Sequence, residues 1–382
     1  MIFLKLIATA AFGIEGLTAD ELRNLGFDNL VVENGRVTFE TDEAGLCRAN
    51  LWLRTAERIL VSVGQFEAYT FDQLFEQTKA LPWEEWLPKN ACFPVNGKSI
   101  NSDLFSISDC QAIVKKAIVE RLKSVYHIDW FEEDGPQYTI EVGLLKDVAT
   151  LTIDTSGPGL HKRGYRVAAG PAPIKETLAS ALLNISYWNW DRVLHDPLCG
   201  SGTIPIEAAM ISANIAPGLS RKFASQEWPN IPESVWKTER EQAFSQIIQD
   251  REIKIIGTDC SDKAISLARH HAEEAGVDHL IHFQKMDLKD ISSKEKYGFI
   301  ITNPPYGTRM NELEEAEELY VQMGKAFAKL DTWSVYVISS HMNFEKFYGK
   351  PANKKRKLFN GRIQCNYYQF FGPPPKRKRP ES

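Results

Sequence analysis

The sequence predicts an α/β protein, with a doubly wound, mainly parallel sheet in its second half and smaller α+β units in its first half. The chain has 382 residues, which is more than one compact core usually holds, so two or three domains are expected. Beyond about residue 175, helical patterns alternate with short apolar strands, as is typical of a parallel sheet. In roughly the first 40 residues, a strand, a helix and a hairpin pattern follow one another, which indicates a small α+β unit.

The first unit opens with an apolar strand over Phe3–Ala10. Thr18-Ala-Asp-Glu21 has the spacing of a capping box, so a helix is expected to begin there and to end at Gly26. Two further strands and the turn between them are expected at Leu30–Val32, Asn34-Gly35 and Arg36–Phe39. Asn-Gly is the dipeptide most typical of a two-residue hairpin turn.

A second unit follows from about residue 53, and its clearest element is a helix that begins at the capping box Ser108-Asp-Cys-Gln111. Six apolar residues share one face of this helix: Ile113, Val114, Ala117, Ile118, Leu122 and Val125. Lys115, Lys116 and Lys123 lie on the opposite side. These lysines form either a solvated face or an RNA contact.

The amino-acid composition changes between Ser156 and Lys175, a segment with four Gly, three Pro, four Lys or Arg and no acid. Such a stretch marks a domain boundary. Together with the patterns before it, this predicts domains over residues 1–52, 53–157 and 158–382.

The third domain contains the alternating pattern. Its expected helices begin near Lys175, after Gly202, at Ser261 and near Glu312. Its expected strands cover Val193–His195, Ile253–Gly257, Ile281–Gln284, Phe299–Thr302 and Ser334–Ser339.

Composition matches that of an ordinary globular protein. The chain is 43% hydrophobic and 25% charged, unlike disordered, collagen-like or disulfide-scaffold sequences. Its six cysteines are scattered without a Cys-x-x-Cys pair, so we expect reduced thiols in a cytoplasmic protein and no metal site. No stretch approaches the roughly 18 apolar residues of a membrane span, and Glu15 with the helical pattern after it argues against a signal peptide.

The formal net charge of −5 conceals an uneven distribution of charge. Eleven Lys or Arg and a single acid, Glu381, lie between Lys346 and Ser382, which leaves +10 there and −15 in the rest of the chain. The average therefore does not exclude a nucleic-acid partner.

A glycine-containing turn, Asp196-Pro-Leu-Cys-Gly-Ser-Gly-Thr203, follows the first strand of the third domain and opens a helix. Gly200 and Gly202 allow a tight turn and a close approach of the backbone to a ligand. The turn lacks the Lys-Ser/Thr of a phosphate loop and the third glycine of the full dinucleotide fingerprint. Alone, it predicts a ligand site and a plain structural turn about equally.

Two acids at the ends of the next strands strengthen the ligand interpretation. Asp259 can accept hydrogen bonds from the hydroxyls of a ribose, and Asp287 can accept a hydrogen bond from an adenine amino group. In the alternative interpretation each acid only caps a helix. The spacing from Gly202 to Asp259 exceeds the roughly 20 residues of the fingerprint, which indicates an inserted helical segment over Pro217–Asp250.

The fourth strand leads into Thr302-Asn-Pro-Pro-Tyr-Gly307. Two prolines forbid a helix here, so the segment forms a loop. The side-chain carbonyl of Asn303 and the backbone carbonyl of Pro304 can hold both hydrogens of a planar amine, which directs the nitrogen lone pair at an electrophile. Tyr306 can stack on the base that carries this amine.

In this order, Asp196–Thr203, Asp259, Asp287 and Asn303–Tyr306 resemble the motifs of class I S-adenosylmethionine-dependent methyltransferases that modify exocyclic amines. The whole chain is similar to a narrower family, the THUMP-domain RNA methyltransferases of the type that makes N2-methylguanosine in bacterial large-subunit ribosomal RNA. The segments that carry this similarity are Phe93–Lys98 and Ser108–Leu122 for the THUMP region, and His161–Arg166 and Pro173–Ala179 for the link into the catalytic domain.

The resemblance implies a ferredoxin-like unit over residues 1–52, a THUMP RNA-binding domain over 53–157 and a Rossmann-like class I methyltransferase domain with a basic tail over 158–382. It implies S-adenosyl-L-methionine as cofactor, no metal, and a monomer or weak homodimer. The implied cofactor residues are Asp196, Gly200, Ser201, Gly202, Asp259 and Asp287, and the implied catalytic residues are Asn303, Pro304, Pro305 and Tyr306.

The expected partner is RNA, with ribosomal RNA first and transfer RNA as the alternative. Lys354–Lys357, Arg362 and Lys376–Arg379 have aromatic neighbours, and charge combined with aromatic rings suits an RNA backbone with exposed bases. The run Lys376–Arg379 could instead be a solubilising tail. An adenine-N6 DNA methyltransferase and a non-catalytic RNA-binding assembly factor remain as other functions.

Overall fold

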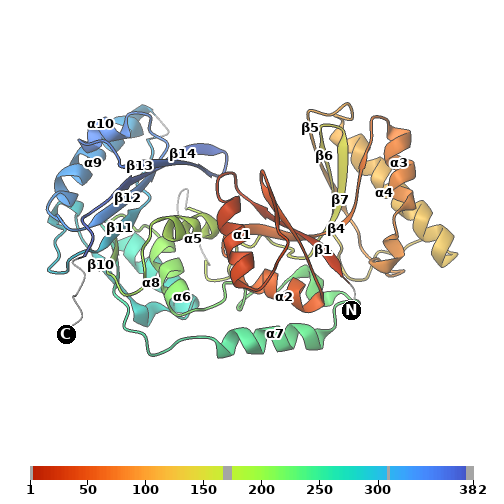
Figure 1. Ribbon diagram of the computed structural model, residues 1–382, viewed down its shortest axis with the longest axis horizontal. Helices are drawn as coiled ribbons and strands as arrows, with labels where there is room; N and C mark the ends of the chain where they lie inside the picture. Colours follow the sequence, from red (N-terminus) through yellow and green to blue (C-terminus); the bar gives the residue numbers. More distant parts are fainter. Residues whose placement is uncertain (1–2, 167–173, 308–309, 376–382) are drawn as a thin grey trace. The chain divides into compact units, whose positions relative to one another are not determined.

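The computed structural model describes residues 3–166, 174–307 and 310–375, in which the chain forms two compact units (Figure 1). The first unit comprises Met1–Ala10, Thr18–Leu160 and Arg221–Gln242, and the second comprises Ala11–Leu17, His161–Ser220 and Ala243–Ser382. Each unit contains a seven-stranded sheet of its own. Within the described residues, no helix is both long and apolar enough to cross a membrane.

The sheet of the first unit has the order β2-β3-β1-β4-β7-β6-β5. Its strands are β1 (Leu4–Ala10), β2 (Val31–Glu33), β3 (Arg36–Thr41), β4 (Ala56–Glu67), β5 (Val95–Ile100), β6 (Ile140–Leu145) and β7 (Val148–Asp154). The 12-residue strand β4 pairs with β1 through its first half, and its pairing with β7 continues through its second half. This one strand therefore joins the N-terminal α+β unit to the strands that follow it.

Helices follow several of these strands in the chain. They are α1 (Glu15–Asn24), α2 (Glu43–Trp52), α3 (Phe71–Ala80), the short 3-10 helix η1 (Trp83–Glu85) and α4 (Ile107–Tyr126). The predicted hairpin is confirmed, with Asn34 and Gly35 between β2 and β3 and a φ of +78° at Gly35.

Both predicted capping boxes are wrong, because each helix begins before its box. Helix α1 starts at Glu15, and the Thr18 hydroxyl lies in the core, 2.9 Å from the hydroxyl of Thr55. Helix α4 starts at Ile107 after the N-cap residue Ser106. The apolar face predicted for α4 is largely buried, whereas Lys115 on its other side lies over the Phe93 ring at 3.4 Å.

The predicted inserted segment leaves the second unit and packs into the first. It contains η2 (Ala224–Glu227) and α7 (Glu233–Ser245). Trp228 stacks on Tyr138 with ring centroids 4.5 Å apart, and its Nε1 donates to the carbonyl of Gln137 at 3.0 Å. The Arg221 guanidinium donates to the carbonyls of Ser156 and Gly159 at 3.1 and 2.8 Å.

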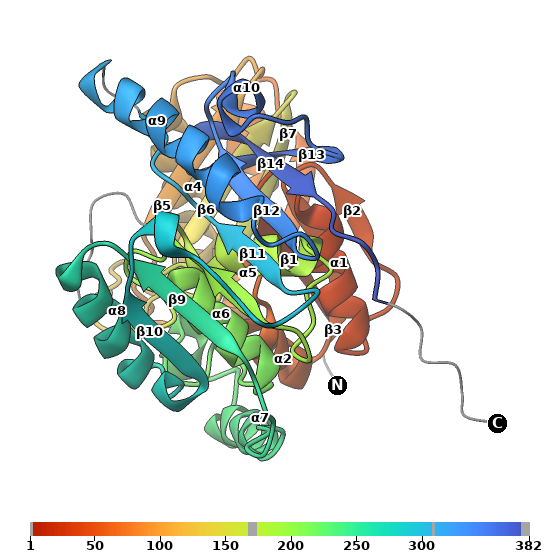
Figure 2. The same cartoon turned by 90° about the vertical axis from the view of Figure 1, so that its left-hand side faces the viewer.

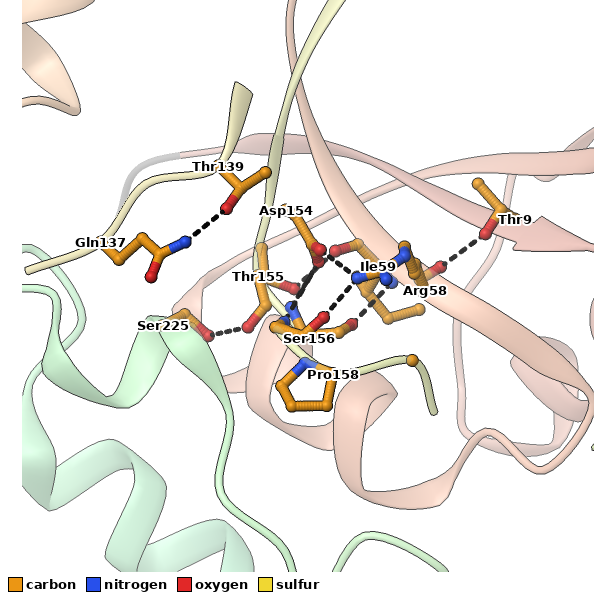
Figure 3. Close-up of polar contacts among 12 residues, drawn as sticks. Thr9, Arg58, Ile59, Gln137, Thr139, Asp154, Thr155, Ser156, Pro158 and Ser225 are labelled. Carbon is orange, nitrogen blue, oxygen red and sulfur yellow. Dashed lines mark hydrogen bonds and ion pairs between the residues drawn. The ribbon is translucent and has the colours of Figure 1, made fainter. Parts of the chain in front are cut away.

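A polar network anchors this segment to the end of β7 (Figure 3). The Ser225 hydroxyl donates to the carbonyl of Thr155 at 2.9 Å, and the Thr155 hydroxyl donates to the carbonyl of Ile59 at 2.7 Å. Arg58 and Asp154 form an ion pair beside them. The long spacing between Gly202 and Asp259 therefore reflects an excursion that completes the core of the other unit.

The sheet of the second unit has the order β10-β9-β8-β11-β12-β14-β13 (Figure 2). Its strands are β8 (Leu194–Asp196), β9 (Ile255–Asp259), β10 (Ile281–Lys285), β11 (Phe299–Thr302), β12 (Ser334–Ser339), β13 (Lys354–Asn360) and β14 (Ile363–Phe370). The first five are parallel, as predicted, whereas β14 and β13 form an antiparallel hairpin that was not predicted from the sequence.

Helices cover this sheet on both faces (Figure 2). They are α5 (Glu176–Ile185), α6 (Thr203–Ser212), α8 (Asp262–Glu274), α9 (Met310–Phe327) and α10 (Phe344–Tyr348), with the 3-10 turns η3 (Asp278–Leu280) and η4 (Leu288–Asp290). Helix α6 packs with α5 and α8, and α9 packs with α10. The predicted doubly wound α/β fold is confirmed.

If the inserted segment is part of the core of the first unit, Trp228→Ala should lower the free energy of unfolding by about 3–5 kcal/mol. The indole is 1% exposed and would leave a cavity beside Tyr138. Urea denaturation followed by circular dichroism measures this change. Trp130, which is 80% exposed, is the matched control, and its replacement by Ala should change stability by less than about 0.5 kcal/mol. Equal changes in the free energy of unfolding for the two substitutions would contradict the packing of Trp228 in the core of the first unit.

Candidate active site

The predicted site residues follow four neighbouring parallel strands. Asp196 ends β8, Asp259 ends β9, Asp287 comes two residues after β10, and Asn303 directly follows β11. Because these strands are parallel and adjacent in the sheet, their carboxyl ends share one edge. Ligands of open α/β sheets bind at this edge.

The two glycines of the turn have different surroundings. Both have positive φ, +52° at Gly200 and +82° at Gly202. A Cβ on Gly202 would lie 2.9 Å from the Cβ of Ala268, so this glycine is needed for packing. A Cβ on Gly200 would meet no atom within 4 Å. Gly200 therefore borders open space, as a ligand-facing position requires.

The carboxylate of Asp196 is buried and connects two strands. The residue is 2% exposed, and its Oδ1 accepts a hydrogen bond from the Thr302 hydroxyl at 2.7 Å. Burial raises the pKa of Asp196 to about 7, although the Thr302 bond opposes this shift. Since Thr302 precedes Asn303, this bond fixes the loop after β11 relative to the turn after β8.

Asp287 caps a 3-10 helix, as the alternative interpretation held, whereas the helix after Asp259 is capped by Ser261 and not by Asp259. Asp259 Oδ1 accepts from the amide of Ser261 at 2.9 Å, while its Oδ2 accepts from the amide of Gly200 at 3.0 Å. Asp287 accepts from the amide of Lys289 at 3.0 Å, and this bond, with the Lys289 ammonium, lowers the pKa of Asp287. Only Asp259 is tied to the glycine turn by these bonds.

Two tyrosine hydroxyls make hydrogen bonds that hold the loop Asn303–Tyr306. The Tyr306 hydroxyl donates to Asn303 Oδ1 at 2.6 Å. The Tyr320 hydroxyl, on α9, donates to the carbonyl of Pro305 at 2.7 Å. Pro304 is buried and Pro305 is exposed. In the part of the chain that the structure describes, no hydrogen bond to the Pro304 carbonyl is present, so this acceptor is unused there.

Two residues of this region were not predicted from the sequence. Tyr320 lies on α9, for which the sequence predicted a helix and no functional residue. Asn360 lies at the end of β13, and its Nδ2 donates to the Tyr306 hydroxyl at 3.3 Å. The only sequence signal for Asn360 is the Asn360-Gly361 dipeptide, which marks a hairpin turn and not a site.

A charged pair beside the glycine turn fits an amino-acid group. Arg166 Nη2 donates to the Thr203 hydroxyl at 2.7 Å, and its Nη1 lies 3.5 Å from Glu176 Oε1. Glu176 is 2% exposed, and its Oε2 has no hydrogen-bond partner among the described residues. A carboxylate oxygen at the start of α5 and a guanidinium bonded to the first residue of α6 are complementary to the ammonium and carboxylate of a methionine moiety. The donor set therefore fits S-adenosylmethionine.

The chain matches family descriptions along most of its length. Residues 5–60 match the RlmL ferredoxin-like domain, and residues 68–154 match the THUMP domain. Residues 163–369, more than half of the chain, match the RMKL-like methyltransferase domain. This chain belongs to that methyltransferase family. The predicted class I methyltransferase fold with ferredoxin-like and THUMP domains before it is thereby confirmed.

Two relatives illustrate the range of this similarity. YpsC of Bacillus subtilis (strain 168), which is named as an RNA methyltransferase, is 51% identical over 99% of this chain and 98% of its own length. The ribosomal RNA large subunit methyltransferase K/L of Syntrophotalea carbinolica is 34% identical over 96% of this chain and 53% of its own length. The chain therefore spans about half the length of the K/L relatives.

Solved structures share the whole fold. A protein of Listeria monocytogenes str. 4b F2365, described as a predicted N6-adenine-specific DNA methylase, is 50% identical with a TM-score of 0.93 and covers 98% of this chain and 97% of its own. The methyltransferase SMU.472 is 43% identical with a TM-score of 0.93, covers 98% of this chain and 100% of its own, and was solved with S-adenosylhomocysteine. The predicted cofactor, S-adenosylmethionine, is confirmed for this family.

The two glycines of the turn should respond differently to alanine. Gly202→Ala should lower the free energy of unfolding by about 1–3 kcal/mol, because its Cβ would overlap Ala268. Gly200→Ala should cost only about 1–2 kcal/mol from its positive φ, yet weaken cofactor binding more than tenfold because its Cβ enters the ligand space. Thermal denaturation and titration calorimetry with S-adenosylmethionine measure these effects. Unchanged cofactor affinity of Gly200→Ala would contradict a ligand-facing role.

Proposed function

We propose that this chain transfers the methyl group of S-adenosylmethionine to the exocyclic amine of guanine in large-subunit ribosomal RNA, producing N2-methylguanosine. The observation that carries this proposal is the common strand edge of Gly200 and Asn303, linked by the Asp196–Thr302 hydrogen bond. The THUMP match and the names of the K/L relatives support RNA, and ribosomal RNA in particular, as the substrate. A cytoplasmic location is part of the same proposal.

The proposed cofactor residues bind and orient, and no metal is required. They are Asp196, Gly200, Ser201, Gly202, Asp259 and Asp287, with Arg166 and Glu176 at the methionine end. The cofactor supplies a methyl group on a sulfonium, which is already a good leaving group. Alignment of the two reactants can therefore supply most of the rate enhancement.

The proposed amine site consists of two carbonyl oxygens and an aromatic ring. Asn303 Oδ1 and the Pro304 carbonyl accept the two hydrogens of the amine, so that its lone pair points along the line of transfer. Pro305 fixes the loop through its carbonyl bond to Tyr320. The Tyr306 ring stacks on the base, as aromatic residues do on extruded bases.

Other substrates fit parts of these observations. A guanine in transfer RNA would use the same amine site, and the description of the Listeria structure favours an adenine in DNA. The THUMP match weighs against DNA as substrate. A purely RNA-binding role is less compatible with the open space beside Gly200 and with the two carbonyl acceptors of the loop, of which Asn303 Oδ1 keeps a second lone pair beside its bond to Tyr306.

The β13–β14 hairpin offers a basic surface beside the proposed amine site. Lys357 is level with Ser339, the last residue of β12, and Arg362 lies in the turn beyond it. Both side chains are exposed. Of the other three basic residues of this strand, Lys354 is exposed, whereas Lys355 pairs with Glu345 at 2.6 Å and Arg356 donates to the carbonyl of Gly13 at 2.6 Å. The run Lys376–Arg379 lies outside the described residues.

Replacement of Asn303 by Ala should abolish methyl transfer while leaving cofactor affinity nearly intact, because the amide contacts the amine and not the cofactor. Transfer of labelled methyl groups to ribosomal RNA and calorimetry with S-adenosylmethionine measure the two effects. Equal loss of both would exclude the role given to Asn303.

The identity of the base can be tested with inosine, which lacks the exocyclic amine of guanosine. An RNA substrate with inosine at the modified position should accept no methyl group, whereas the matched guanosine RNA and an RNA with inosine elsewhere should react. Duplex DNA containing adenine serves as the competing substrate. Methylation of the DNA, or of the inosine-substituted position, would contradict guanine N2 as the target.

The hairpin surface should contribute to RNA affinity. Each of Lys357→Ala and Arg362→Ala should weaken RNA binding and reduce the slope of log K against log salt by about 1. Lys254→Ala is the control, because Lys254 precedes β9, towards the opposite edge of the same sheet, and pairs with Glu295 at 3.0 Å. Fluorescence anisotropy between low and high salt measures the slopes. Equal slopes for all three variants would remove the hairpin from the RNA interface.

A further inference from the structure

A chain of three hydrogen-bonding side chains ends on the proposed amine acceptor. Asn360 Nδ2 donates to the Tyr306 hydroxyl at 3.3 Å, and this hydroxyl donates to Asn303 Oδ1 at 2.6 Å. Asn360 comes from the tip of the β13–β14 hairpin, whereas Asn303 and Tyr306 follow β11. Asn360 and Tyr306 are 54 residues apart in sequence, so only the folded sheet brings them together.

The direction of these bonds determines which end of the Asn303 amide faces the tyrosine. A tyrosine hydroxyl has one hydrogen to donate, and its oxygen can accept. Asn360 donates to this oxygen, so the single hydrogen goes to another partner. Of the two groups beside the hydroxyl that can accept it, the Cys365 sulfur is a weak acceptor, whereas Asn303 Oδ1 lies at 2.6 Å and takes it as a carbonyl oxygen. Burial raises the pKa of Tyr306, so the hydroxyl keeps its hydrogen.

The amide orientation matters because the two ends of asparagine have opposite chemistry. Oδ1 has a second lone pair that can accept a hydrogen of the target amine, whereas Nδ2 can only donate. An amide turned by 180° would present Nδ2 hydrogens to the hydrogens of the amine. In the described part of the chain, the Tyr306 hydroxyl is the sole hydrogen-bonding partner of the Asn303 side chain.

We propose that Asn360 is a positioning residue that fixes the orientation of the Asn303 amide through the Tyr306 hydroxyl before the base arrives. This role rests on the proposed function, in which Asn303 Oδ1 accepts from the target amine. Asn360 itself contacts neither substrate nor cofactor in this assignment. Its effect depends on being a donor, which distinguishes it from a residue that only packs.

Replacement of Asn360 by Asp provides the sharpest test, because it changes a donor into an acceptor at nearly constant size. The carboxylate introduced by this substitution would accept the hydroxyl hydrogen, and the tyrosine oxygen would then accept from Asn303 Nδ2, which turns the amide. Asn360→Asp should therefore lower kcat by about 100-fold. Asn360→Ala removes the donor, so neither orientation of the Asn303 amide is favoured through Tyr306. This variant should lower kcat by about threefold to tenfold, the worth of one hydrogen bond.

The hydroxyl-free variant Tyr306→Phe separates the relay from other effects of a new charge. In that background, Asn360→Asp should cause less than a twofold further loss, since no hydroxyl remains to transmit it. Asn353→Asp is the charge-matched control, because Asn353 Oδ1 accepts from the amide of Phe371 near the opposite end of the hairpin and an aspartate can do the same. This control should retain native kcat and KM for RNA.

A second readout does not depend on activity. The side-chain amide nitrogen of Asn303, assigned in TROSY spectra by its loss in Asn303→Ala, should shift downfield in Asn360→Asp, because Nδ2 becomes a donor to Tyr306. It should not shift in Asn353→Asp. Absence of methyl transfer by the native protein, with the spectral shift present, would refute the proposed function and keep the relay. Equal losses for Asn360→Asp in the native and Tyr306→Phe backgrounds, or no spectral shift, would overturn the relay.

Discussion

The hydrogen bond from the Thr302 hydroxyl to the buried Asp196 carboxylate connects the two halves of the proposed site. Asp196 precedes the turn that contains Gly200, and Thr302 precedes Asn303, so this bond fixes the distance between the cofactor turn and the amine acceptor. Methyl transfer depends on the alignment of its two reactants, and small displacements of a reacting atom cost large factors in rate. The burial that raises the pKa of Asp196 also excludes water from this bond.

The first unit depends on a segment that belongs by sequence to the second. Arg221, Ser225 and Trp228 leave the Rossmann-like domain between α6 and β9, and they satisfy carbonyls and fill core space around β7. The doubly wound fold tolerates this excursion because it occurs in a connection and not in a strand. The motifs of the catalytic domain therefore keep their order although their spacing is unusual.

The pattern of the sequence was sufficient for the parallel strands and for the residues at their carboxyl ends, because apolar strands and glycine turns are local signals. The helix starts predicted at Thr18 and Ser108 were wrong because both helices begin earlier in the chain. The Thr18 side chain does not cap a helix, because its hydroxyl contacts that of Thr55 in the core. Strand β13 begins with four consecutive basic residues, so the alternation of apolar and polar residues that is typical of a strand is absent from that part. Asn360 could not be assigned to the site, since its contact with Tyr306 exists only once distant strands pair.

The most direct measurement is nucleoside mass spectrometry of ribosomal RNA, transfer RNA and DNA from cells lacking this protein and from the same cells carrying the native gene or the Asn303→Ala variant. Loss of one N2-methylguanosine from large-subunit ribosomal RNA, restored by the native gene and not by the variant, is the expected result. Unchanged N2-methylguanosine in both RNAs, or loss of N6-methyladenine from DNA, would contradict methyl transfer to guanine.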